Sequence, residues 1–485
     1  MPIDKDLLSI QEARDLAAQA YEAQLVWGKA SQEQVDRVCA AMAEAGYQAS
    51  DRLGRMASEE TGYGVAAHKK LKNELASRVL WDSIKDIKTV GVIKHDPEKR
   101  LYEIAWPMGV VAALTPSTNP TSTVFAKALS AVKARDAIIV APHPAAVNCS
   151  AEAARTLQQA AENAGAPLGL INCMRTISLG GTQELMKHKR VRVILATGGE
   201  GMVKAAHSVG KPAYGVGPGN VPVYVDRSAD LEKAARYIVS SKSFDYSLIC
   251  ASEQSVVVDK PAAAQLAQRM QANGAYFADE RTADILRRIL FNPDGTMNVA
   301  TVGKSPQFLA QLGGFEVPAD ARIIVVRLNR VGAQEPLSRE KLTTVLGWFE
   351  EEGWEDGCER CIELIHFGGR GHSLVLHATD QNVIMAFGLE KPVFRVLVNT
   401  MGTLGAVGLT TGVMPSLTLG AGGEGGSVTG DNITVHHLFN IKRLAYETTP
   451  PPEAAMVGSG AFSEPNQQEL ESIVRQVMLE TLAKN

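Results

Sequence analysis

The sequence predicts an α/β protein with two mostly parallel sheets, each covered by helices. From Met108 to Asp226, apolar runs of strand length alternate with amphipathic runs of helix length. The same alternation restarts after Asp230 and continues to about residue 400. Such alternation is typical of doubly wound sheets, in which each crossover carries a helix. Two α/β domains that meet near residue 230 are therefore expected.

Composition and charge exclude several classes of protein. The chain has 485 residues, of which 45% are apolar and 21% charged, as in ordinary globular proteins. Lys and Arg number 49 against 53 Asp and Glu, so no excess positive charge is available to bind nucleic acid or a lipid surface. No apolar run is long enough to cross a membrane, and residues 1–16 lack the apolar core of a secretory signal. Six cysteines are too few for a disulfide framework, which favours a reduced, cytoplasmic protein.

The first 85 residues predict helices. Ser31 and Gln34 form a capping box, and Cys39 lies on the apolar stripe that follows, so we expect it in the core. Two extended runs come next, at 89–96 and 100–107. The turn-like residues between them predict a hairpin.

The alternating region predicts a series of strands and helices. In the first domain, strands are expected at 108–115, 137–142, 169–174, 190–199 and 221–226, and helices at 124–136 and 151–165. In the second domain, strands are expected at 254–260, 321–328, 372–378 and 394–399, and helices near 261–273, 354–366 and 381–388. Ligands of such sheets bind at the carboxyl ends of the strands, so the loops after strands are the first candidates for a site.

Three polar residues in loops are candidates for catalysis. Cys250 lies in a loop that enters a strand near the domain junction, where a thiol can act as a nucleophile. Asn119 follows a buried strand and could donate an N–H to an oxyanion, although asparagine is also an ordinary turn residue. His372 stands in the glycine-rich run GGRGHS, where it could be a general base or a hydrogen-bonded structural residue.

Glycine-rich turns alone indicate a nucleotide site only weakly. Gly198, Gly199 and Gly201 lie between a strand and a helix, where backbone N–H groups can meet a phosphate, but a tight turn has the same pattern. Cys358 and Cys361 form a CxxC inside a helical pattern without a second pair, and no histidine has metal-ligand spacing. We therefore expect no metal site.

Taken in order, these segments resemble the CoA-acylating aldehyde dehydrogenases, which include the aldehyde dehydrogenase half of bifunctional aldehyde–alcohol dehydrogenases. Six runs carry the resemblance: GVVAALTPSTNPTSTVFAKALSAVKARDAIIVAPHP, ATGGEGMVKAAHSVGKPAYGVGPGN, SFDYSLICASEQSVVV, SREKLTTVL, HFGGRGHS and PSLTLGAGGEGGSVTGDN. Together they cover about residues 10–446.

The resemblance implies an aldehyde dehydrogenase-like fold with a Rossmann-like cofactor domain, an α/β catalytic domain and a small oligomerisation hairpin. A homo-oligomer, at least a dimer, is expected. The implied segments are the cofactor-binding domain at 1–229 with its hairpin at about 89–107, the catalytic domain at 230–428, a return segment at 429–446, a flexible linker at 447–465 and an amphipathic helix at 466–485.

The resemblance also implies a mechanism. Cys250 matches the nucleophile, whose thiolate forms a thiohemiacetal with the aldehyde, and Asn119 with the backbone N–H of Cys250 matches the oxyanion hole. Hydride transfer to the nicotinamide leaves an acyl-thioester on Cys250, which the thiol of CoA attacks to release acyl-CoA. His372 is the candidate for assisting proton transfer.

The cofactor residues carry over by motif. Glu340 matches the carboxylate that holds the nicotinamide ribose. The other cofactor positions are Thr115, Pro116, His143, Thr197, Gly198, Gly199, Val216 and Gly217. His143 lies in the run that corresponds to the KPSE motif of hydrolytic relatives, whose carboxylate binds the adenosine ribose. This chain lacks that carboxylate, which would repel the 2′-phosphate of NADP. NAD is expected as the cofactor, with NADP as the alternative.

One absence separates thiolysis from hydrolysis. Hydrolytic aldehyde dehydrogenases carry a glutamate general base in an ELGGK motif, and the corresponding stretch here, 215–219, has no carboxylate. Water would lack its base, whereas the more acidic thiol of CoA needs less help. The sequence therefore favours attack by CoA.

Residues 466–485 predict an amphipathic helix on a flexible tether. Asn466 and Glu469 form an N-cap pair. Six apolar residues share one face: Leu470, Ile473, Val474, Val477, Met478 and Leu482. The helix resembles the encapsulation peptides that bind enzymes to shell proteins of bacterial microcompartments. Docking on its own oligomer is the alternative.

The expected reaction converts a short aldehyde to acyl-CoA with reduction of NAD(P), inside a microcompartment. Acetaldehyde is the first candidate and propionaldehyde the second, and sulfoacetaldehyde stays open because Arg370 could face an anionic group, although a solvent-facing arginine is the simpler interpretation. The alternatives are a hydrolytic dehydrogenase that makes the free acid, a reductase of acyl phosphates, and a catalytically inactive cargo scaffold. Neither a nucleic acid nor a membrane is expected as a partner.

Overall fold

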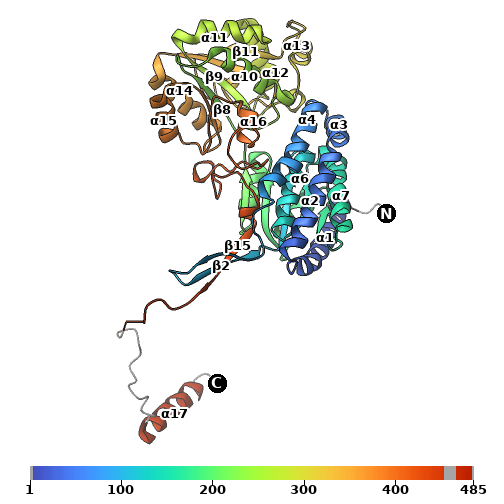
Figure 1. The fold of residues 1–485 in the computed structure, drawn as a ribbon, viewed down its shortest axis with the longest axis vertical. Helices are drawn as coiled ribbons and strands as arrows, with labels where there is room; N and C mark the ends of the chain where they lie inside the picture. Colours follow the sequence, from blue (N-terminus) through green and yellow to red (C-terminus); the bar gives the residue numbers. More distant parts are fainter. Residues whose placement is uncertain (1–3, 453–465, 483–485) are drawn as a thin grey trace. The chain divides into compact units, whose positions relative to one another are not determined.

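The computed structural model describes residues 4–452 and 466–482, which contain two parallel sheets with their helices and a separate three-stranded sheet (Figure 1). One compact unit comprises residues 4–91 and 105–441, and a second comprises residues 92–104 and the segment from 442 onward. The expected α/β class with two parallel sheets is confirmed.

The region before the first strand is helical, as predicted. It contains α1 (Lys5–Trp27), α2 (Gln32–Gln48), α3 (Ser50–Thr61), α4 (Ala66–Glu74), a π-helical turn (Leu75–Val79) and α5 (Leu80–Ile84). The capping box forms at the start of α2, where Gln34 N donates to Ser31 Oγ and Ser31 N donates to Gln34 Oε1. Cys39 of the same helix is fully buried, which confirms its place in the core.

The first sheet has five parallel strands in the order β5-β4-β3-β6-β7. Its strands are β3 (Val110–Thr115), β4 (Ala137–Pro142), β5 (Ile171–Cys173), β6 (Val191–Thr197) and β7 (Ala213–Val216). Its connecting helices are α6 (Pro120–Lys133), α7 (Val147–Asn163), α8 (Leu179–Lys187) and α9 (Glu200–His207). The sequence did not predict β7, because four residues that include Gly215 carry little strand signal of their own.

The second sheet has seven parallel strands in the order β10-β11-β12-β9-β8-β13-β14. Its strands are β8 (Val221–Val225), β9 (Glu253–Asp259), β10 (Ala275–Phe277), β11 (Ile323–Arg327), β12 (Val345–Glu351), β13 (Leu374–His377) and β14 (Val396–Val398). Its helices are α10 (Leu231–Ser243), α11 (Lys260–Ala272), α12 (Glu280–Leu290), α13 (Pro306–Gly313), α14 (Gly353–Gly368), α15 (Gln381–Glu390) and α16 (Gly402–Ala406). Strands β10 and β12 were not predicted.

The chain changes sheet between β7 and β8, which is earlier than the boundary expected near residue 230. Alternation along the chain assigns 221–226 to the first domain. In the structure, β8 pairs with β9 on one side and with β13 on the other, so it lies within the second sheet. Periodicity identifies a strand but not its partners, because pairing depends on contacts between distant segments.

The second sheet buries side chains on both faces, as expected for a sheet covered by helices on each side. Val223 and Val256 belong to one apolar cluster with α10, α11 and α16, whereas Tyr224 and Val257 belong to a second cluster with α12, α14 and α15. This switch between consecutive residues follows the period of two in a strand. Figure 1 labels the helices that surround this sheet.

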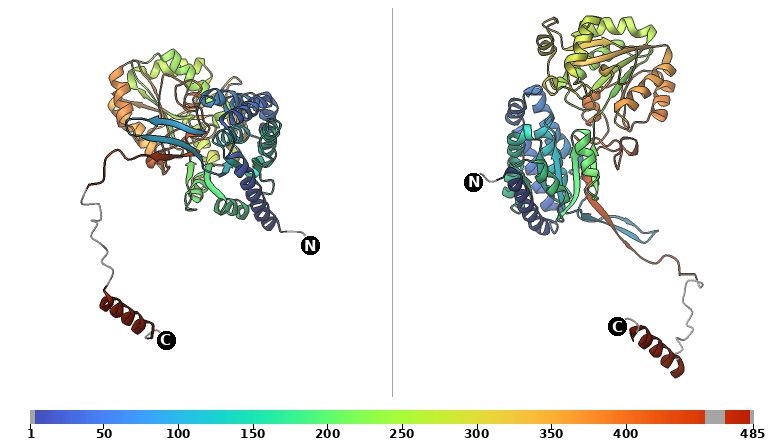
Figure 2. Two further views of the ribbon diagram at one scale, coloured as in Figure 1. Left: turned by 60° about the horizontal axis from the view of Figure 1, so that its bottom comes forward. Right: turned by 180° about the vertical axis from the view of Figure 1, so that it is seen from behind.

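The predicted hairpin is confirmed. It consists of β1 (Gly91–Asp96) and β2 (Leu101–Pro107), and β15 (Phe439–Ala445) joins β2 to complete a three-stranded sheet in the order β1-β2-β15. Figure 2 shows these strands as a narrow ribbon. Just beyond β15, Tyr446 N donates to Arg100 O at 3.1 Å, and the Tyr446 ring meets Tyr102 edge-on. The return segment therefore stacks on the hairpin.

The C-terminal helix forms as α17 (Gln467–Leu482). Asn466 N donates to Glu469 Oε2 and Glu469 N donates back to Asn466 Oδ1, both at 3.0 Å, which is the predicted N-cap pair. Four apolar side chains of the expected face are about half exposed: Leu470, Ile473, Val474 and Val477. The linker was predicted at 447–465, and its residues 453–465 lie outside the described residues. The side chains of Met478 and Leu482 lie outside them as well. None of the helices in the described ranges has the length and apolarity needed to cross a membrane.

Candidate active site

The three catalytic candidates come from loops at two different sheet edges. Asn119 follows β3, at the carboxyl edge of the first sheet, and begins α6. Cys250 precedes β9 and His372 precedes β13, and both strands flank β8. Because these strands are parallel, the two side chains lie at the amino edge of the second sheet. The expected position of Cys250 in a loop that enters a strand is confirmed, as is that of His372 in the approach to one. The general expectation that ligand-binding loops follow strands does not apply to this pair.

The thiol of Cys250 and the imidazole of His372 are in contact. His372 Nε2 lies 3.1 Å from Cys250 Sγ, and His372 Nδ1 lies 3.1 Å from Ser373 Oγ. Arg395 Nε donates to the same serine oxygen at 3.2 Å. His372 is only 1% exposed, whereas Cys250 is partly accessible. In the tautomer with its proton on Nδ1, His372 presents the Nε2 lone pair to the thiol.

Both groups are uncharged at neutral pH. Burial, opposed by the charge of Arg395, raises the pKa of Cys250 to about 12, and the nearby Glu340 adds to the rise. Burial and the charge of Arg395 together lower the pKa of His372 to about 3. A thiol with such a pKa reacts only if a neighbouring group accepts its proton, and the neutral imidazole is at hydrogen-bond distance.

Gly219 lies between the cysteine backbone and the histidine ring. A Cβ at this position would lie 2.3 Å from Cys250 O and 3.0 Å from His372 Cγ, so only glycine fits. Its N–H donates to Glu340 Oε1 at 2.9 Å. Sequence reasoning noted this glycine only as part of a weak glycine-rich run, because its function here is to leave space.

Asn119 is fixed beside the loop of the nucleophile. Its Nδ2 donates to Leu248 O at 2.9 Å, two residues before Cys250, and lies 3.2 Å from Thr118 Oγ1. Its Oδ1 accepts from Lys72 Nζ at 2.5 Å. The amide donor therefore faces the loop of the thiol, and both of its N–H groups have acceptors.

Three consecutive residues before Cys250 have left-handed backbone. Asp245, Tyr246 and Ser247 have φ values of 49°, 51° and 68°. Each such non-glycine residue costs roughly 1–2 kcal/mol. Ser247 Oγ donates to Ser252 Oγ at 2.8 Å, and the buried carboxylate of Asp245 holds the start of the turn. This turn is a strained support for the nucleophile, of the kind that tertiary contacts maintain at functional sites.

The expected cofactor positions gather at the carboxyl edge of the first sheet. They end or follow β3, β4, β6 and β7: Thr115, Pro116, His143, Thr197, Gly198, Gly199, Val216 and Gly217. Thr115 Oγ1 is buried without a hydrogen-bond partner in the described structure, and a Cβ at Gly199 or Gly217 would meet no atom within 4 Å. An unpaired hydroxyl and open backbone at this edge fit a nucleotide.

Glu340 lies apart from these positions, before β12 of the second sheet. Burial raises its pKa to about 7, against the opposite effects of the Gly219 N–H and of Lys242 and Lys341. Its carboxylate accepts a hydrogen bond from Gly219 N, and Gly219 in turn packs against the backbone of Cys250. Arg370, which could have faced an anionic substrate, is exposed.

Arg395 is a residue of this region that sequence reasoning missed. It is 4% exposed, and besides Ser373 it donates to Gly430 O at 2.8 Å and Gly420 O at 2.5 Å. In the sequence, Arg395 is marked only as a charged residue directly before the apolar run at 396–398, which does not indicate a function. Among the described residues, no group of three or more His, Cys, Asp or Glu side chains is arranged to hold a metal ion.

The chain matches the model of the aldehyde dehydrogenase family over residues 7–277. It is 48% identical to an acetylating aldehyde dehydrogenase from Geobacillus thermoglucosidasius, with a TM-score of 0.92 over 93% of this chain and 100% of that one. It spans about half the length of the first curated relatives it matches, such as aldehyde-alcohol dehydrogenase 2 of Entamoeba histolytica, at 40% identity over 86% of this chain and 49% of that one.

Two further solved structures contain ligands. A propionaldehyde dehydrogenase from Rhodopseudomonas palustris, with bound CoA and an acylated cysteine, is 27% identical over 90% of this chain and 97% of that one, with a TM-score of 0.82. An engineered glycolyl-CoA reductase with bound NADP+ is 26% identical over 90% and 96%, with a TM-score of 0.80.

Proposed function

Because the chain belongs to the aldehyde dehydrogenase family, we propose that it converts a short aldehyde and CoA to acyl-CoA with reduction of a nicotinamide cofactor. The contact between Cys250 Sγ and His372 Nε2 carries this proposal, because it pairs a nucleophile with a proton acceptor. The acetylating relative and the relative with CoA and an acylated cysteine support the same chemistry.

The first step is attack by the cysteine. His372 Nε2 accepts the thiol proton, and the thiolate of Cys250 adds to the aldehyde carbon to form a thiohemiacetal. The oxygen of that adduct develops negative charge, which Asn119 Nδ2 and the backbone N–H of Cys250 stabilise. Arg395 Nε donates to Ser373 Oγ, and the same oxygen contacts His372 Nδ1, so Arg395 helps to orient the histidine.

The cofactor is held by the residues at the carboxyl edge of the first sheet. The backbone at Gly198 and Gly199, which precedes α9, accommodates the pyrophosphate, and Thr115 offers its unpaired hydroxyl. Glu340 receives the nicotinamide ribose hydroxyls. When bound, the nicotinamide accepts hydride. We propose NAD as the cofactor and NADP as the alternative, because a relative binds NADP+ and His143 offers no carboxylate against a 2′-phosphate.

The acyl-thioester on Cys250 is resolved by the thiol of CoA. The position expected to carry the base of hydrolytic enzymes is Gly215, where a Cβ would lie 2.5 Å from Val203 Cγ1 and 2.6 Å from His207 Nε2. A glutamate has no room there, so water lacks that base. Glu340 is the nearby carboxylate, and its Oε1 already accepts from Gly219 N. Once the proton taken from Cys250 has passed to solvent, His372 Nε2 is again free to accept the proton of the CoA thiol. It returns that proton to the Cys250 thiolate when the acyl group leaves.

We propose acetaldehyde as the substrate, with propionaldehyde second. The acetylating relative supports the first, and the propionaldehyde dehydrogenase supports the second. Sulfoacetaldehyde has less support, because Arg370 is exposed and the buried Arg395 is committed to backbone carbonyls.

The decisive experiment measures NADH formation from acetaldehyde with and without CoA and identifies the product by mass spectrometry. Acetyl-CoA that forms only when CoA is present supports the proposal. Acetate formed without CoA would mean that water resolves the thioester. Dependence on phosphate would indicate a reductase of acyl phosphates, and no turnover with any aldehyde or either cofactor would favour the inactive scaffold.

The oligomer and the compartment are proposals of the same kind. The apolar residues Val92, Ile441 and Leu444 of the three-stranded sheet are exposed, which supports a homo-oligomer that covers them. The half-exposed apolar side chains of α17 support a helix that binds a groove of a microcompartment shell protein. We propose that the enzyme is held in the lumen by this helix, with docking on its own oligomer as the alternative.

A further inference from the structure

We propose that Lys72 is a positioning residue of the oxyanion site, and that Lys69, Lys72 and Asp245 form a clamp which holds Asn119 against the loop of Cys250. This inference rests on the proposed function, because it assigns Asn119 and Cys250 their roles. Neither lysine was singled out by the sequence, which shows them only as part of a polar helix.

The clamp joins two loops through one helix. Lys69 and Lys72 are three residues apart on α4 and therefore share a face. Lys69 Nζ donates to Thr118 O at 3.0 Å and to Asp245 Oδ2 at 3.2 Å. Lys72 Nζ donates to Asn119 Oδ1 at 2.5 Å and also to Asp245 Oδ2. Each lysine thus connects the loop of the oxyanion donor with the loop of the nucleophile.

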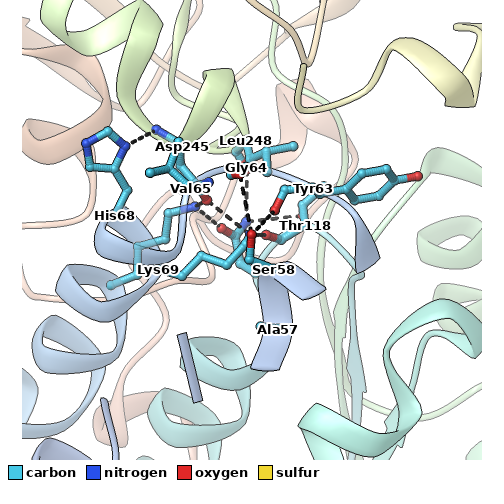
Figure 3. Close-up of polar contacts among 12 residues, drawn as sticks. Ala57, Ser58, Tyr63, Gly64, Val65, His68, Lys69, Thr118, Asp245 and Leu248 are labelled. Atoms are coloured by element: carbon cyan, nitrogen blue, oxygen red, sulfur yellow. Dashed lines mark hydrogen bonds and ion pairs between the residues drawn. The ribbon is translucent and has the colours of Figure 1, made fainter. Parts of the chain in front are cut away.

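The helix start completes the attachment of Asp245. Val65 N donates to Asp245 Oδ1 at 2.6 Å, and Asp245 N donates to His68 Nδ1 at 2.8 Å. Figure 3 shows Val65, His68 and Lys69 directed toward this aspartate. A Cβ at Gly64 would lie 2.1 Å from Asp245 Oδ1, so glycine allows this close approach. The left-handed turn at Asp245 is therefore held by one short segment.

Lys72 determines which end of the Asn119 amide faces the nucleophile. Its ammonium has only donors, so the amide must present Oδ1 to it. The Nδ2 end then points the other way, toward Leu248 O in the Cys250 loop. If the amide were flipped, its NH2 group would face the ammonium of Lys72, donor against donor. The ammonium would lose this acceptor, at a cost of about 1–3 kcal/mol.

The clamp also carries a net positive charge. Two ammonium groups, each 3% exposed, face one fully buried carboxylate. Burial raises the pKa of Asp245, but the charges of Lys72 and Lys69 outweigh it and the net pKa is lowered. Burial lowers the pKa of Lys72 to about 8, against the opposite effect of Asp245. Near neutral pH the excess charge favours a thiolate at Cys250 and an oxyanion beside it.

Single removal of Lys72 is expected to preserve the fold. In Lys72→Met, Asp245 keeps its ion pair with Lys69 and its bond from Val65 N, so no buried charge loses every partner. Lys70 supplies a matched control, because it lies on the same helix, is about half exposed and pairs with Glu74. Lys70→Met removes the same charge from the solvent side.

The test is the alkylation rate of Cys250 by neutral iodoacetamide, followed on the Cys250 peptide by mass spectrometry from about pH 7 to 9. Four groups act on this thiol: His372, Glu340, Arg395 and Lys72. We expect Lys72→Met to slow alkylation about tenfold and to lower kcat about a hundredfold, with KM for the cofactor unchanged. Lys72→Arg is expected to restore the alkylation rate, and Lys70→Met to match the wild type.

An unchanged alkylation rate in folded Lys72→Met would overturn the inference. If that variant does not fold, Lys72→Gln serves instead, because it keeps a neutral donor and removes the charge; equal alkylation rates in Lys72→Gln and the wild type would also overturn it. Alkylation reports on Cys250 without any turnover. A slowed alkylation in a protein that never forms acyl-CoA would therefore support the clamp and contradict the proposed function.

Discussion

His372 Nε2 lies 3.1 Å from Cys250 Sγ, although 122 positions separate the two residues in the sequence. Parallel pairing of β8 with both β9 and β13 brings their loops together. Burial keeps the imidazole of His372 neutral and the thiol of Cys250 protonated, so the resting site holds no buried ion pair. The proton can move from the thiol to the imidazole when the cysteine reacts. The chemistry of the site depends on this contact.

Replacing Cys250 by alanine should abolish acyl-CoA formation and leave the fold and cofactor binding intact. The nucleophile is lost, whereas every cofactor position except Glu340 lies at the edge of the other sheet, and Glu340 itself is unchanged. Product analysis by mass spectrometry and cofactor titration check both parts. Cys173→Ala is the matched control, because Cys173 is also partly exposed but lies at the end of β5. Residual thioester formation in Cys250→Ala would contradict the assignment.

Replacing His372 by glutamine should lower kcat about a hundredfold or more, because the thiol loses its proton acceptor. Alkylation of Cys250 should slow in parallel. His366→Gln, at an exposed position of α14, is the control and should behave as the wild type. Equal kcat values for His372→Gln and the control would remove the histidine from the mechanism.

Gly219→Ala should disrupt the site through a steric clash. The added Cβ would lie 2.3 Å from Cys250 O and must displace either the cysteine backbone or the His372 ring. Overpacking of this kind costs about 1–3 kcal/mol, so we expect a lower Tm together with loss of activity. Gly388→Ala in α15, where a Cβ would meet no atom within 4 Å, should leave activity unchanged and should not lower the Tm, because alanine favours a helix. Full activity of Gly219→Ala would show that the backbone there is not tightly held.

Stability should fall as the pH is lowered from about 6.5. Burial lowers the pKa of His377 to about 4 and that of His372 to about 3, both below the value of an unfolded histidine. The unfolded state therefore binds more protons in this range, and the stabilisation present above about pH 6.5 is lost as pH falls toward the folded values.

Urea denaturation of the wild type and of His377→Gln between about pH 7 and 5 isolates one group. The variant should show a shallower decline, by up to about 1.4 kcal/mol per pH unit. An identical pH dependence of the free energy of unfolding in the two proteins would contradict the assignment to His377.

Deletion of residues 464–485 should preserve dehydrogenase activity and abolish binding to a shell protein. The residues described at the active site lie between 64 and 430, so the deletion removes none of them. Co-sedimentation with the shell protein measures the binding. Ile473→Asp should reproduce the loss, whereas Ser472→Asp, on the polar side, should not. Equal recruitment of the truncated and complete proteins would refute targeting by this helix.

The strong local patterns were predictable from sequence. The helices before residue 85, the hairpin, α17 and most strands of four or more apolar residues were expected at nearly their observed positions. The weak elements were not: β7 contains a glycine, β10 has three residues, and β12 was not recognised as a strand. Their pairing with neighbouring strands stabilises them more than their own propensity does.

The candidate residues Cys250, Asn119 and His372 were selected by motif order, and the structure brings Cys250 and His372 into contact and Asn119 against the same loop. The supporting residues were missed. Gly219 contributes space, Arg395 acts through Ser373, and Lys72 acts through Asn119. None of these functions has a local sequence pattern, because each depends on a residue far away in the chain.

The amino-acid sequence by itself determined the α/β class, the helical start, the hairpin and the order of residues with reactive side chains. Periodicity and turn chemistry act over a few residues, so they can be read locally. Only the tertiary structure decided that β8 joins the second sheet, that the amino edge of that sheet carries the thiol and imidazole, and that burial keeps both neutral. Strand pairing, desolvation and buried charge depend on which distant segments meet, and no local pattern encodes that meeting.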